Sequence, residues 1–580
     1  MTYDFIARNL HRLELPEHPL ALQSPAMFRS DPPVVKLLQE ESTSHPFAVT
    51  VAAAWSCYGA RPANAENVLK LVYGEPKEGL SAEKLAARDD RRERAIKLYA
   101  DLFAAGHHTT FQHSTFIFVL DNVSRLALWS FFHSHPFYNS EQVSQRYREV
   151  TGETMTAPDL PGHLTSVYDH ATQTSFDAYS RMVEILTPDF EKLYTQVFPA
   201  RAKAQSDAAK ARFANDVQKR AQEVARYVLP LATPAHLYHT VNGLTLLRYY
   251  VLANQPDAPT EVRYIVNQMV SQILEMDPYF LGGPRHPLDL TPLANEQSLE
   301  AETFRDWHTN LGQNRDGAER FFEEYDAQLG GLNSKLVQFN PNGEQVLAEA
   351  VRTVMGMKAG SISDEDAIAR VLDGSQNAYH GHAVFLGMHS KLMQTMNHVQ
   401  FTFQKKISGA EDAQNQRHRG TPGSSPMLTA HLRQNPDVII PWAVRQNPEA
   451  LEVYNNAVQT MWDAKNQLLA ADANPEAALY LLPNSHNVRF HESGSLLNYY
   501  WKWIKRLCLD AQREISETAW QEVKQVRDIH PIIGKYVDGP PCVMRDRANR
   551  RPICPEGERY CGIPVWRNYS LDTLPDKRVM

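Results

Sequence analysis

The chain has 580 residues, which is about three to four times the usual domain length, so at least two domains are expected. Its 59 basic and 67 acidic residues give a formal net charge of −8, which excludes a general nucleic-acid binder recognisable by net charge but leaves a local basic pocket open. Hydrophobic residues make up 43% and charged residues 22%, a composition typical of globular rather than disordered proteins.

The sequence indicates neither a membrane protein nor an exported one. No apolar run approaches the roughly 18–20 residues that a membrane span needs. The first residues, MTYDFIARNLHRLELPEH, lack the basic-then-apolar pattern of an export signal. Five cysteines are too few for a disulfide scaffold. We therefore expect a cytoplasmic protein with no membrane partner and no nucleic-acid partner.

The local patterns predict a mixed α+β fold. A helix is predicted to begin at the N-cap residue Ser81 and to end before Gly106, which suits a C-terminal cap. Residues 115–120 and 399–404 are short β-branched and aromatic runs that predict strands. Residues 502–527 place apolar side chains near helical spacing and predict a second long helix.

Proline and glycine mark a division near the middle of the chain. They are concentrated in residues 281–293 and 340–343. The expected layout is a first domain at 1–282, a linker at 283–344 and a second domain at 345–580.

The two halves resemble each other. The run from His113 to Phe118 matches the run from His398 to Phe403, with an offset of 285 residues. Val123-Ser124 matches Ile407-Ser408 with an offset of 284. Further along, four matches share one offset of 253: Leu229-Pro230 with Leu482-Pro483, Ala258 with Ala511, Glu261 with Glu514 and Pro278 with Pro531. We interpret the halves as two diverged copies of one domain, the first with about 32 extra residues between the matching blocks.

Three motifs of the first copy occur in a familiar order. They are Gly-His-His-Thr-Thr-Phe-Gln-His at 106–113, Ser124-Arg125, and Glu-Gln-Val-Ser-Gln-Arg-Tyr at 141–147. In this order they resemble the flavin-dependent thymidylate synthases, the ThyX family. Gln112 replaces a glutamate of the family pattern, and Ser134-His135-Pro136 replaces its Arg-His-Arg.

The second copy keeps what the first has lost. Its Ser408, Gln414 and Arg-His-Arg at 417–419 have the family spacing, but no Ser-x-Arg-Tyr follows them. The family's Thr-Val-Asn survives as Thr240-Val241-Asn242, with Ala253 at the later arginine position, whereas the second copy has Ser495 and keeps Arg506. The resemblance spans roughly 50–282 and 345–565.

The resemblance implies reductive methylation of dUMP to dTMP, with FAD as cofactor and with methylenetetrahydrofolate and NADPH as co-substrates. The residues it assigns to flavin binding are His107, Thr109, His113, Asn242, Arg417, His418 and Arg419. Those assigned to dUMP are Glu141, Gln142, Ser144, Arg146 and Arg506, and the catalytic candidates are Arg506 and Gln414. A hydroxyl beside a planar guanidinium suits a phosphate, and a cationic cluster suits the negative charge of a reduced flavin.

Other functions remain open at this stage. The alternatives are a related flavoenzyme that modifies another uracil-containing substrate and a catalytically inactive structural relative. The unrelated thiol-dependent thymidylate synthases need a cysteine nucleophile, and no Cys-His pair occurs here. The Gly-x-Gly-x-x-Gly pattern of dinucleotide-binding folds is also missing.

The C-terminal segment contains Cys542, Cys554 and Cys561. Together with His530 or Cys508 as a fourth ligand they could bind zinc, but eleven and six intervening residues are not the CxxC spacing of common structural sites. A similar tail occurs on some family members. Reduced structural thiols are the preferred interpretation, and no metal site is predicted.

The resemblance also implies an assembly. Single-copy family members form homotetramers whose sites are built from several subunits, so a chain with two copies should form a homodimer. About two composite sites are expected, each drawing Ser144 and Arg146 from a first copy and Arg419 and Arg506 from a second.

Overall fold

A computed structural model describes the chain over residues 27–74, 78–151, 155–254, 259–290, 315–377, 379–380, 382, 385–426, 428–471, 473 and 475–579. The N-terminal residues examined for an export signal, Ala258 and the middle of the expected linker lie outside these ranges. Among the described helices, none combines the length and apolar character that a membrane crossing requires.

The first unit is built on a four-stranded antiparallel sheet of order β1-β2-β4-β3. Its strands are β1 (Val34–Leu37), β2 (Thr115–Ser124), β3 (Asn139–Gln142) and β4 (Pro234–Asn242). The aromatic run that predicted β2 buries Phe116, Phe118 and Leu120 completely, as alternation in a half-buried strand requires. Helices α9 (Gly243–Ala253) and α10 (Thr260–Met276) follow β4.

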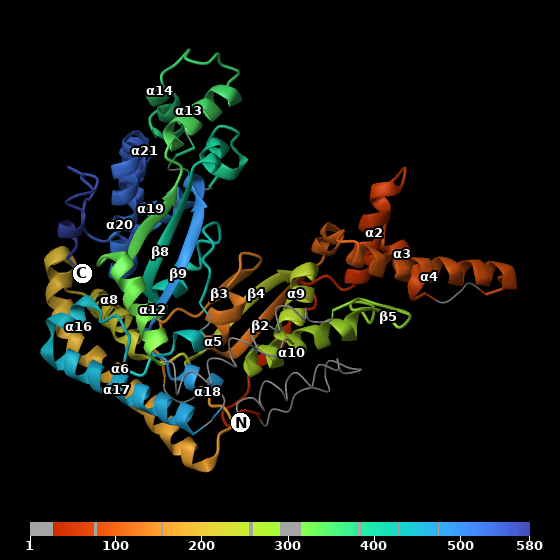
Figure 1. Ribbon diagram of the computed structural model, residues 1–580, viewed down its shortest axis with the longest axis horizontal. Helices are drawn as coiled ribbons and strands as arrows, with labels where there is room; N and C mark the ends of the chain where they lie inside the picture. The colour runs from red at the N-terminus through yellow and green to blue at the C-terminus, as the bar shows by residue number, and fades with distance from the viewer. Residues whose placement is uncertain are drawn as a thin grey trace.

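Three helices extend this unit to one side of the molecule (Figure 1). They are α2 (Pro46–Tyr58), α3 (Ala65–Val72) and α4 (Ala82–Ala104). The predicted start of α4 is confirmed, since the Ser81 hydroxyl accepts a hydrogen bond from the Lys84 amide. Its end is confirmed by Gly106, whose φ of 76° belongs to the left-handed region that a C-terminal glycine cap uses.

The second unit repeats this plan on a sheet of order β7-β8-β9. Its strands are β7 (Ser334–Phe339), β8 (Gln400–Ser408) and β9 (Asn487–Ser495). The helices around it are α12 (Arg315–Leu329), α13 (Gly343–Val354), α14 (Asp364–Leu372), α15 (Gly409–Asn415), α19 (Leu496–Arg506), α20 (Arg513–Ile529), α21 (Pro531–Val537) and α22 (Pro541–Arg547). The prediction of an α+β fold with two tandem copies is confirmed.

The sequence offsets reappear as offsets between elements. The bounds of β9, α19 and α20 are those of β4, α9 and α10 displaced by 253 residues. The 3₁₀ turns η3 (His108–His113) and η8 (Met393–His398) differ by 285. The offset falls to 284 inside β2, because a bulge between Leu120 and Val123 adds a residue there.

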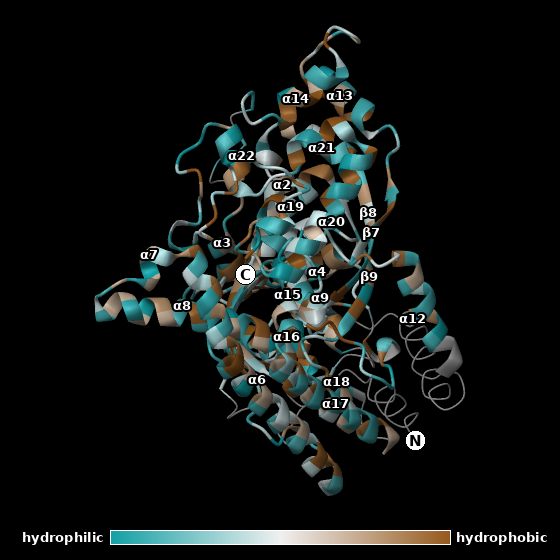
Figure 2. Ribbon diagram, turned by 90° about the vertical axis from the view of Figure 1, so that its left-hand side faces the viewer, coloured by the Kyte–Doolittle hydropathy of each residue, from teal (hydrophilic) through white to brown (hydrophobic). Residues whose placement is uncertain are grey.

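The two units join through a shared hydrophobic core. Helix α6 (Gly162–Val197) of the first copy lies beside α17 (Pro448–Ala470) of the second, as both ribbon views show (Figures 1 and 2). Tyr168 and Met182 on α6 and Tyr454 and Met461 on α17 belong to one buried cluster. Helix α8 (Asp207–Ala225) lies between the matching blocks, in the stretch where the first copy is longer.

Hydrogen bonds cross this junction reciprocally. The carboxylate of Glu514 accepts hydrogen bonds from Ser408 of its own copy and from the Tyr227 hydroxyl of the other. Glu261 likewise accepts from Ser124 and from the Tyr480 hydroxyl, at 2.7 Å. Tyr227 and Tyr480 differ by the same 253 residues as the two glutamates, so the contact is that of a twofold interface within one chain.

The prediction of one helix over 502–527 is wrong. Helix α19 ends at Arg506 and α20 begins at Arg513. The carbonyls of the intervening residues are satisfied from outside: Arg578 donates to the Cys508 and Ala511 carbonyls, at 3.4 and 2.9 Å. Because these partners are distant in sequence, helical periodicity does not reveal the break.

The range expected to be a linker, 283–344, contains part of the second sheet. β7 pairs with β8, Ser334 opposite Lys405 and Phe339 opposite Phe401. β7 is a short edge strand in which only Ser334 is fully buried, so its sequence pattern is weak. The second unit therefore begins before residue 345.

Candidate functional site

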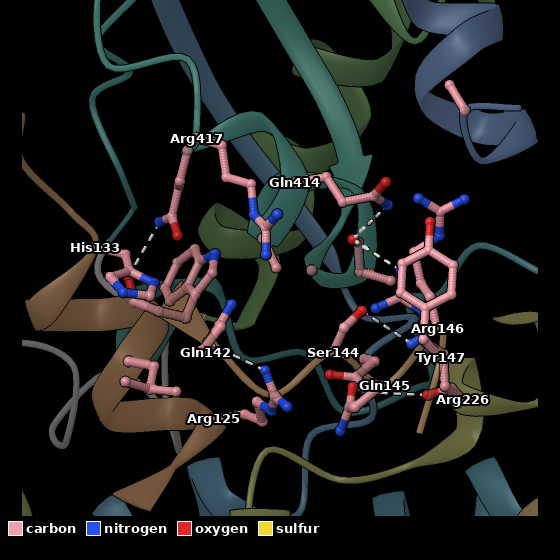
Figure 3. A pocket seen from close by; sticks show the side chains of 18 of the residues that line it. Arg125, His133, Gln142, Ser144, Gln145, Arg146, Tyr147, Arg226, Gln414 and Arg417 are labelled. Atoms are coloured by element: carbon pink, nitrogen blue, oxygen red, sulfur yellow. Dashed lines mark hydrogen bonds between the residues drawn. The ribbon is translucent and has the colours of Figure 1, made fainter. Parts of the chain in front are cut away.

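A cavity of about 400 Å³ lies between the two copies, and we call it the main cavity. Figure 3 shows Arg417 reaching toward Gln142 and Arg125 on one side, with Ser144 and Arg146 on the other. A smaller cavity of about 260 Å³, the side cavity, shares His133, Gln142 and Arg417 with it. The remaining walls of the side cavity include Tyr138, Glu141, Tyr238 and Arg419.

The loop after β3 presents Ser144 and Arg146 to the main cavity. The Tyr147 amide donates to the Ser144 carbonyl at 3.2 Å, which closes a turn, and the Arg146 amide donates to the Ser144 hydroxyl at 3.3 Å. The Arg146 guanidinium pairs with Glu223 at 2.7 Å and donates to the Asp510 carbonyl of the second copy at 3.1 Å. Its side chain is only 14% exposed, so its position is fixed by both copies.

The opposite wall is built around the loop that follows α15. The Ser408 hydroxyl caps this short helix, Gln414 lies in its last turn, and residues 417–419 follow its end. Arg506 donates to His418 Nε2 at 2.8 Å and to the Gln414 carbonyl at 2.7 Å. Burial, together with the positive charge of Arg506, holds the pKa of His418 well below its usual value, so this imidazole is a neutral acceptor.

The main cavity carries a strong excess of positive charge. Among its described lining residues, seven are cationic (Arg125, Arg146, Arg226, Arg417, Lys505, Arg506 and Arg559) and two, Asp510 and Glu556, are carboxylates. Burial and the neighbouring arginines lower the pKa of Arg125 to about 9 and that of Arg506 to about 10. An anion bound among these side chains would relieve their mutual repulsion.

Several buried polar atoms at this site have no hydrogen-bond partner in the described structure. They are the Nε atoms of Arg125 and Arg226, Nε2 of Gln145 and Oε1 of Gln414. Buried polar groups are normally hydrogen-bonded, so these atoms are available to a bound polar molecule or to water. Three of the four are donors, which suits an anionic molecule that also carries a donor for Gln414 Oε1.

Arg417 and Arg419 face the side cavity differently. The exposed Arg417 side chain makes no hydrogen bond or ion pair with any residue that the structure describes. Arg419 donates to Asn139 Oδ1 at 3.1 Å, and its guanidinium lies 5.3 Å from the centre of the Tyr138 ring. Glu141 and Gln142 were both expected to bind dUMP. Glu141 lines only the side cavity, whereas Gln142 lines both cavities.

The first copy's expected flavin residues lie elsewhere. His107, Thr109 and His113 are exposed at η3, before β2 begins. Asn242 caps α9, its side-chain oxygen accepting from the Thr245 amide at 2.9 Å. They lie near Thr115 at the start of the ten-residue strand β2, whereas Arg125 of the main cavity follows its end, so the rise of a strand puts about 30 Å between them and the main cavity. The side cavity lies nearer, since it includes Thr240, two residues before Asn242, and Asn139, which pairs with Thr240. Among the described residues, His107, Thr109, His113 and Asn242 line neither cavity.

Sequence reasoning assigned no role to several residues of the main cavity, among them Arg125, His133 and Arg226. Arg125 belongs to the Ser-Arg motif, and that motif was the available signal. Arg226 is 6% exposed and donates to Gln512, but it belongs to no motif. His133 is half-buried, and desolvation together with the positive charge of Arg125 lowers its pKa to about 3.

The twofold relation between the copies does not produce a second such site. The counterparts of Arg226 and Arg506, at the offset of 253, are Leu479 and Ala253, and both are buried in hydrophobic core. The counterpart position thus lacks two guanidinium groups. One chain carries one cationic cavity of this composition among the residues described.

Comparison with known proteins agrees with the motifs. The sequence model described as "Thymidylate synthase complementing protein" matches residues 37–279 and 335–532, more than half of the chain. A flavin-dependent thymidylate synthase of Saccharolobus solfataricus is 26% identical over 253 residues, which cover 42% of this chain and 90% of the relative. One of Clostridium tetani is 27% identical over 247 residues, which cover 42% of this chain and 83% of the relative.

Among solved structures, the UMP/dUMP methylase PolB from Streptomyces cacaoi, bound with 5-Br dUMP, aligns with 43% of this chain and 94% of its own at 19% identity and a TM-score of 0.29. That likeness is too slight to carry any conclusion, whereas the two segments matched by the family model are extensive. The chain belongs to the family of thymidylate synthase complementing proteins, and it matches that family twice.

Proposed function

We propose that this protein is a flavin-dependent thymidylate synthase that methylates dUMP to dTMP, using FAD, methylenetetrahydrofolate and NADPH. The observation that carries the proposal is the cationic main cavity, in which Ser144 and Arg146 of one copy face Arg506 of the other. The volume of about 400 Å³ falls within the range of small-molecule sites.

The phosphate of dUMP would bind near Ser144 and Arg146. Arg146 uses its Nε and one terminal nitrogen on Glu223 and the Asp510 carbonyl, and its other terminal nitrogen makes no hydrogen bond with the described residues. That nitrogen and the Ser144 hydroxyl are donors of the kind that phosphate oxygens accept. The unpaired Nε atoms of Arg125 and Arg226 add further donors nearby.

The uracil ring would bind against Arg506 and Gln414. Gln414 Oε1 has no partner, which suits the N3–H donor of uracil. Arg506 is held by His418 and by the Gln414 carbonyl, so its charge is fixed beside the ring carbonyl edge. A fixed positive charge at that edge would favour the electron-rich form of the ring that carbon transfer requires.

The side cavity suits a flavin. Tyr138 and Tyr238 provide aromatic walls, and Arg417 and Arg419 provide positive charge. The unpartnered Arg417 would neutralise negative charge on the reduced cofactor. A bound reduced flavin supplies the hydride, so the reaction needs no enzyme thiol.

Product analysis tests the proposal directly. Purified protein supplied with FAD, NADPH, methylenetetrahydrofolate and dUMP is expected to form dTMP, identified by mass spectrometry, and to form none when the folate is left out. A parallel reaction with UMP separates a deoxyribose-specific enzyme from one with another uracil substrate. Flavin-loaded protein that yields no methylated pyrimidine from either nucleotide would contradict the proposed function.

We further propose that the flavin sites lie between two chains. The proposal is supported by the exposure of His107 and His113, which line neither cavity of their own chain and are therefore open to contact from a second chain. Light scattering should then give twice the chain mass of 65.8 kDa. A monomer that binds FAD fully would contradict this arrangement.

Mixed dimers give a sharper test of the same arrangement. A chain with Arg417→Ala and a chain with His107→Ala and His113→Ala should each lose flavin as homodimers. Co-expressed and purified as a mixed dimer, they should regain about one flavin per two chains, since one of the two sites is then free of substitutions. If both residue sets acted within one chain, the mixed dimer would stay without flavin.

A further inference from the structure

Four of the five cysteines of the chain converge at one place beside the main cavity. Cys508, Cys542, Cys554 and Cys561 all line a small cavity of about 10 Å³, which we call the cysteine cavity. None of the four is disulfide-bonded. Cys508 follows α19, Cys542 lies in α22, and the other two belong to the C-terminal tail, so segments distant in sequence meet here.

We propose that these four thiols bind a zinc ion that fixes the C-terminal tail to the second copy. Zinc in structural sites prefers four thiolate or imidazole ligands in a tetrahedron, with sulfur at about 2.3 Å. A cavity of this volume holds roughly one water-sized atom, which is the size that a single ion requires.

The choice of ligands follows from which residues reach the cysteine cavity. The tail spacing alone left His530 and Cys508 as alternatives for the fourth ligand. His530 packs against Phe339 and Phe401 and lines no part of this cavity, whereas Cys508 does. The tail turns sharply after its last cysteine, since Gly562 has a φ of 83°.

The four thiols are not in a metal-binding arrangement in this structure. Among the described residues, no group of three or more histidine, cysteine or acidic side chains has the geometry to hold a metal ion. Each cysteine sulfur is positioned by one torsion angle, χ1, which has three staggered settings. Binding would therefore require rotations of these four side chains around the existing cavity, with the backbone segments already in place.

A metal here would also order part of the main cavity. Glu556 lines both the cysteine cavity and the main cavity, and it lies 3.8 Å from Lys505. Arg559 also lines the main cavity, with its guanidinium 5.1 Å from the centre of the Tyr147 ring. Both lie between two of the proposed ligands, Cys554 and Cys561, so the ion would anchor the loop that carries them.

Metal analysis tests this proposal independently of the proposed reaction. Full-length protein, purified without a metal-affinity tag from zinc-supplemented cells, should contain about one zinc per chain by plasma mass spectrometry. Cys508→Ser and Cys554→Ser should each reduce the content at least tenfold. Cys57→Ser is the matched control, because Cys57 is exposed on α2 and lies outside the cavity.

X-ray absorption at the zinc edge covers the case in which the serine variants fail to fold, since it uses the unaltered protein. Four sulfur neighbours at about 2.3 Å would support the site. The proposal is overturned by unaltered protein holding less than about a tenth of a zinc per chain, or by Cys508→Ser holding as much zinc as the Cys57→Ser control. It is equally overturned by an intact mass showing these cysteines paired as disulfides.

Discussion

Replacing Arg417 and Arg419 by alanine is expected to strip the flavin from the purified protein. A hydrogen bond to a charged group is worth about 1.5–3 kcal/mol, so losing two should weaken binding by a factor of about a hundred or more. Arg417 makes no hydrogen bond or ion pair with the described part of the chain, so its removal should leave the fold intact. Flavin absorbance per chain and the thermal midpoint of unfolding measure the two effects separately.

Arg320→Ala is the matched control for this experiment. Arg320 is an exposed arginine on α12 that lines neither cavity, so the control makes the same type of substitution, with the loss of one positive charge, without touching the proposed flavin site. Its flavin content should equal that of the unaltered protein. Undiminished flavin in the double variant would place the cofactor away from the side cavity.

Arg146→Lys is expected to raise the dissociation constant for dUMP by about tenfold or more. Lysine keeps a positive charge opposite Glu223 but loses the planar fork that binds two oxygens at once. Alanine would be less informative, because the buried Glu223 would lose one of its two arginine partners, the other being Arg220, and the fold would be destabilised as well. Titration calorimetry with dUMP gives the affinity and the number of sites.

The same titration should give about one dUMP per chain, since Leu479 and Ala253 replace the counterparts of two cavity arginines. Arg148→Lys, at an exposed arginine that does not line the main cavity, should bind dUMP as the unaltered protein does. Equal affinities for Arg146→Lys and the unaltered protein would move the phosphate elsewhere, or show that dUMP is not the ligand.

The parts of the fold that the sequence predicted are those decided by local chemistry. The strands at β2 and β8 come from continuous β-branched and aromatic runs, and the limits of α4 come from Ser81 and Gly106. The break between α19 and α20 was missed because a distant residue, Arg578, donates hydrogen bonds to the carbonyls of Cys508 and Ala511. Such tertiary contacts leave no periodic signal in the segment that they interrupt.

The candidate site likewise contains residues that the sequence predicted and residues that it did not predict. Motif order pointed to Ser144, Arg146 and Gln414, and the fold brings all three to the main cavity. Arg125 and Arg226 enter that cavity through the pairing of the two copies, and a linear pattern does not encode that pairing. Conversely, Asn242 matched a motif, yet its side-chain oxygen is engaged in capping a helix.

The crossed tyrosines limit how this chain can be divided or recombined. If the halves were separated, the buried carboxylates of Glu261 and Glu514 would each lose the hydroxyl that the other half supplies, and a broad hydrophobic face would be open to water. Neither half should behave as an independent module in domain shuffling or truncation. Protease nicking between the copies, by contrast, should leave the fragments bound together. An ancestral duplication that became fixed in this way would be difficult to reverse, because each half now carries part of the interior of the other.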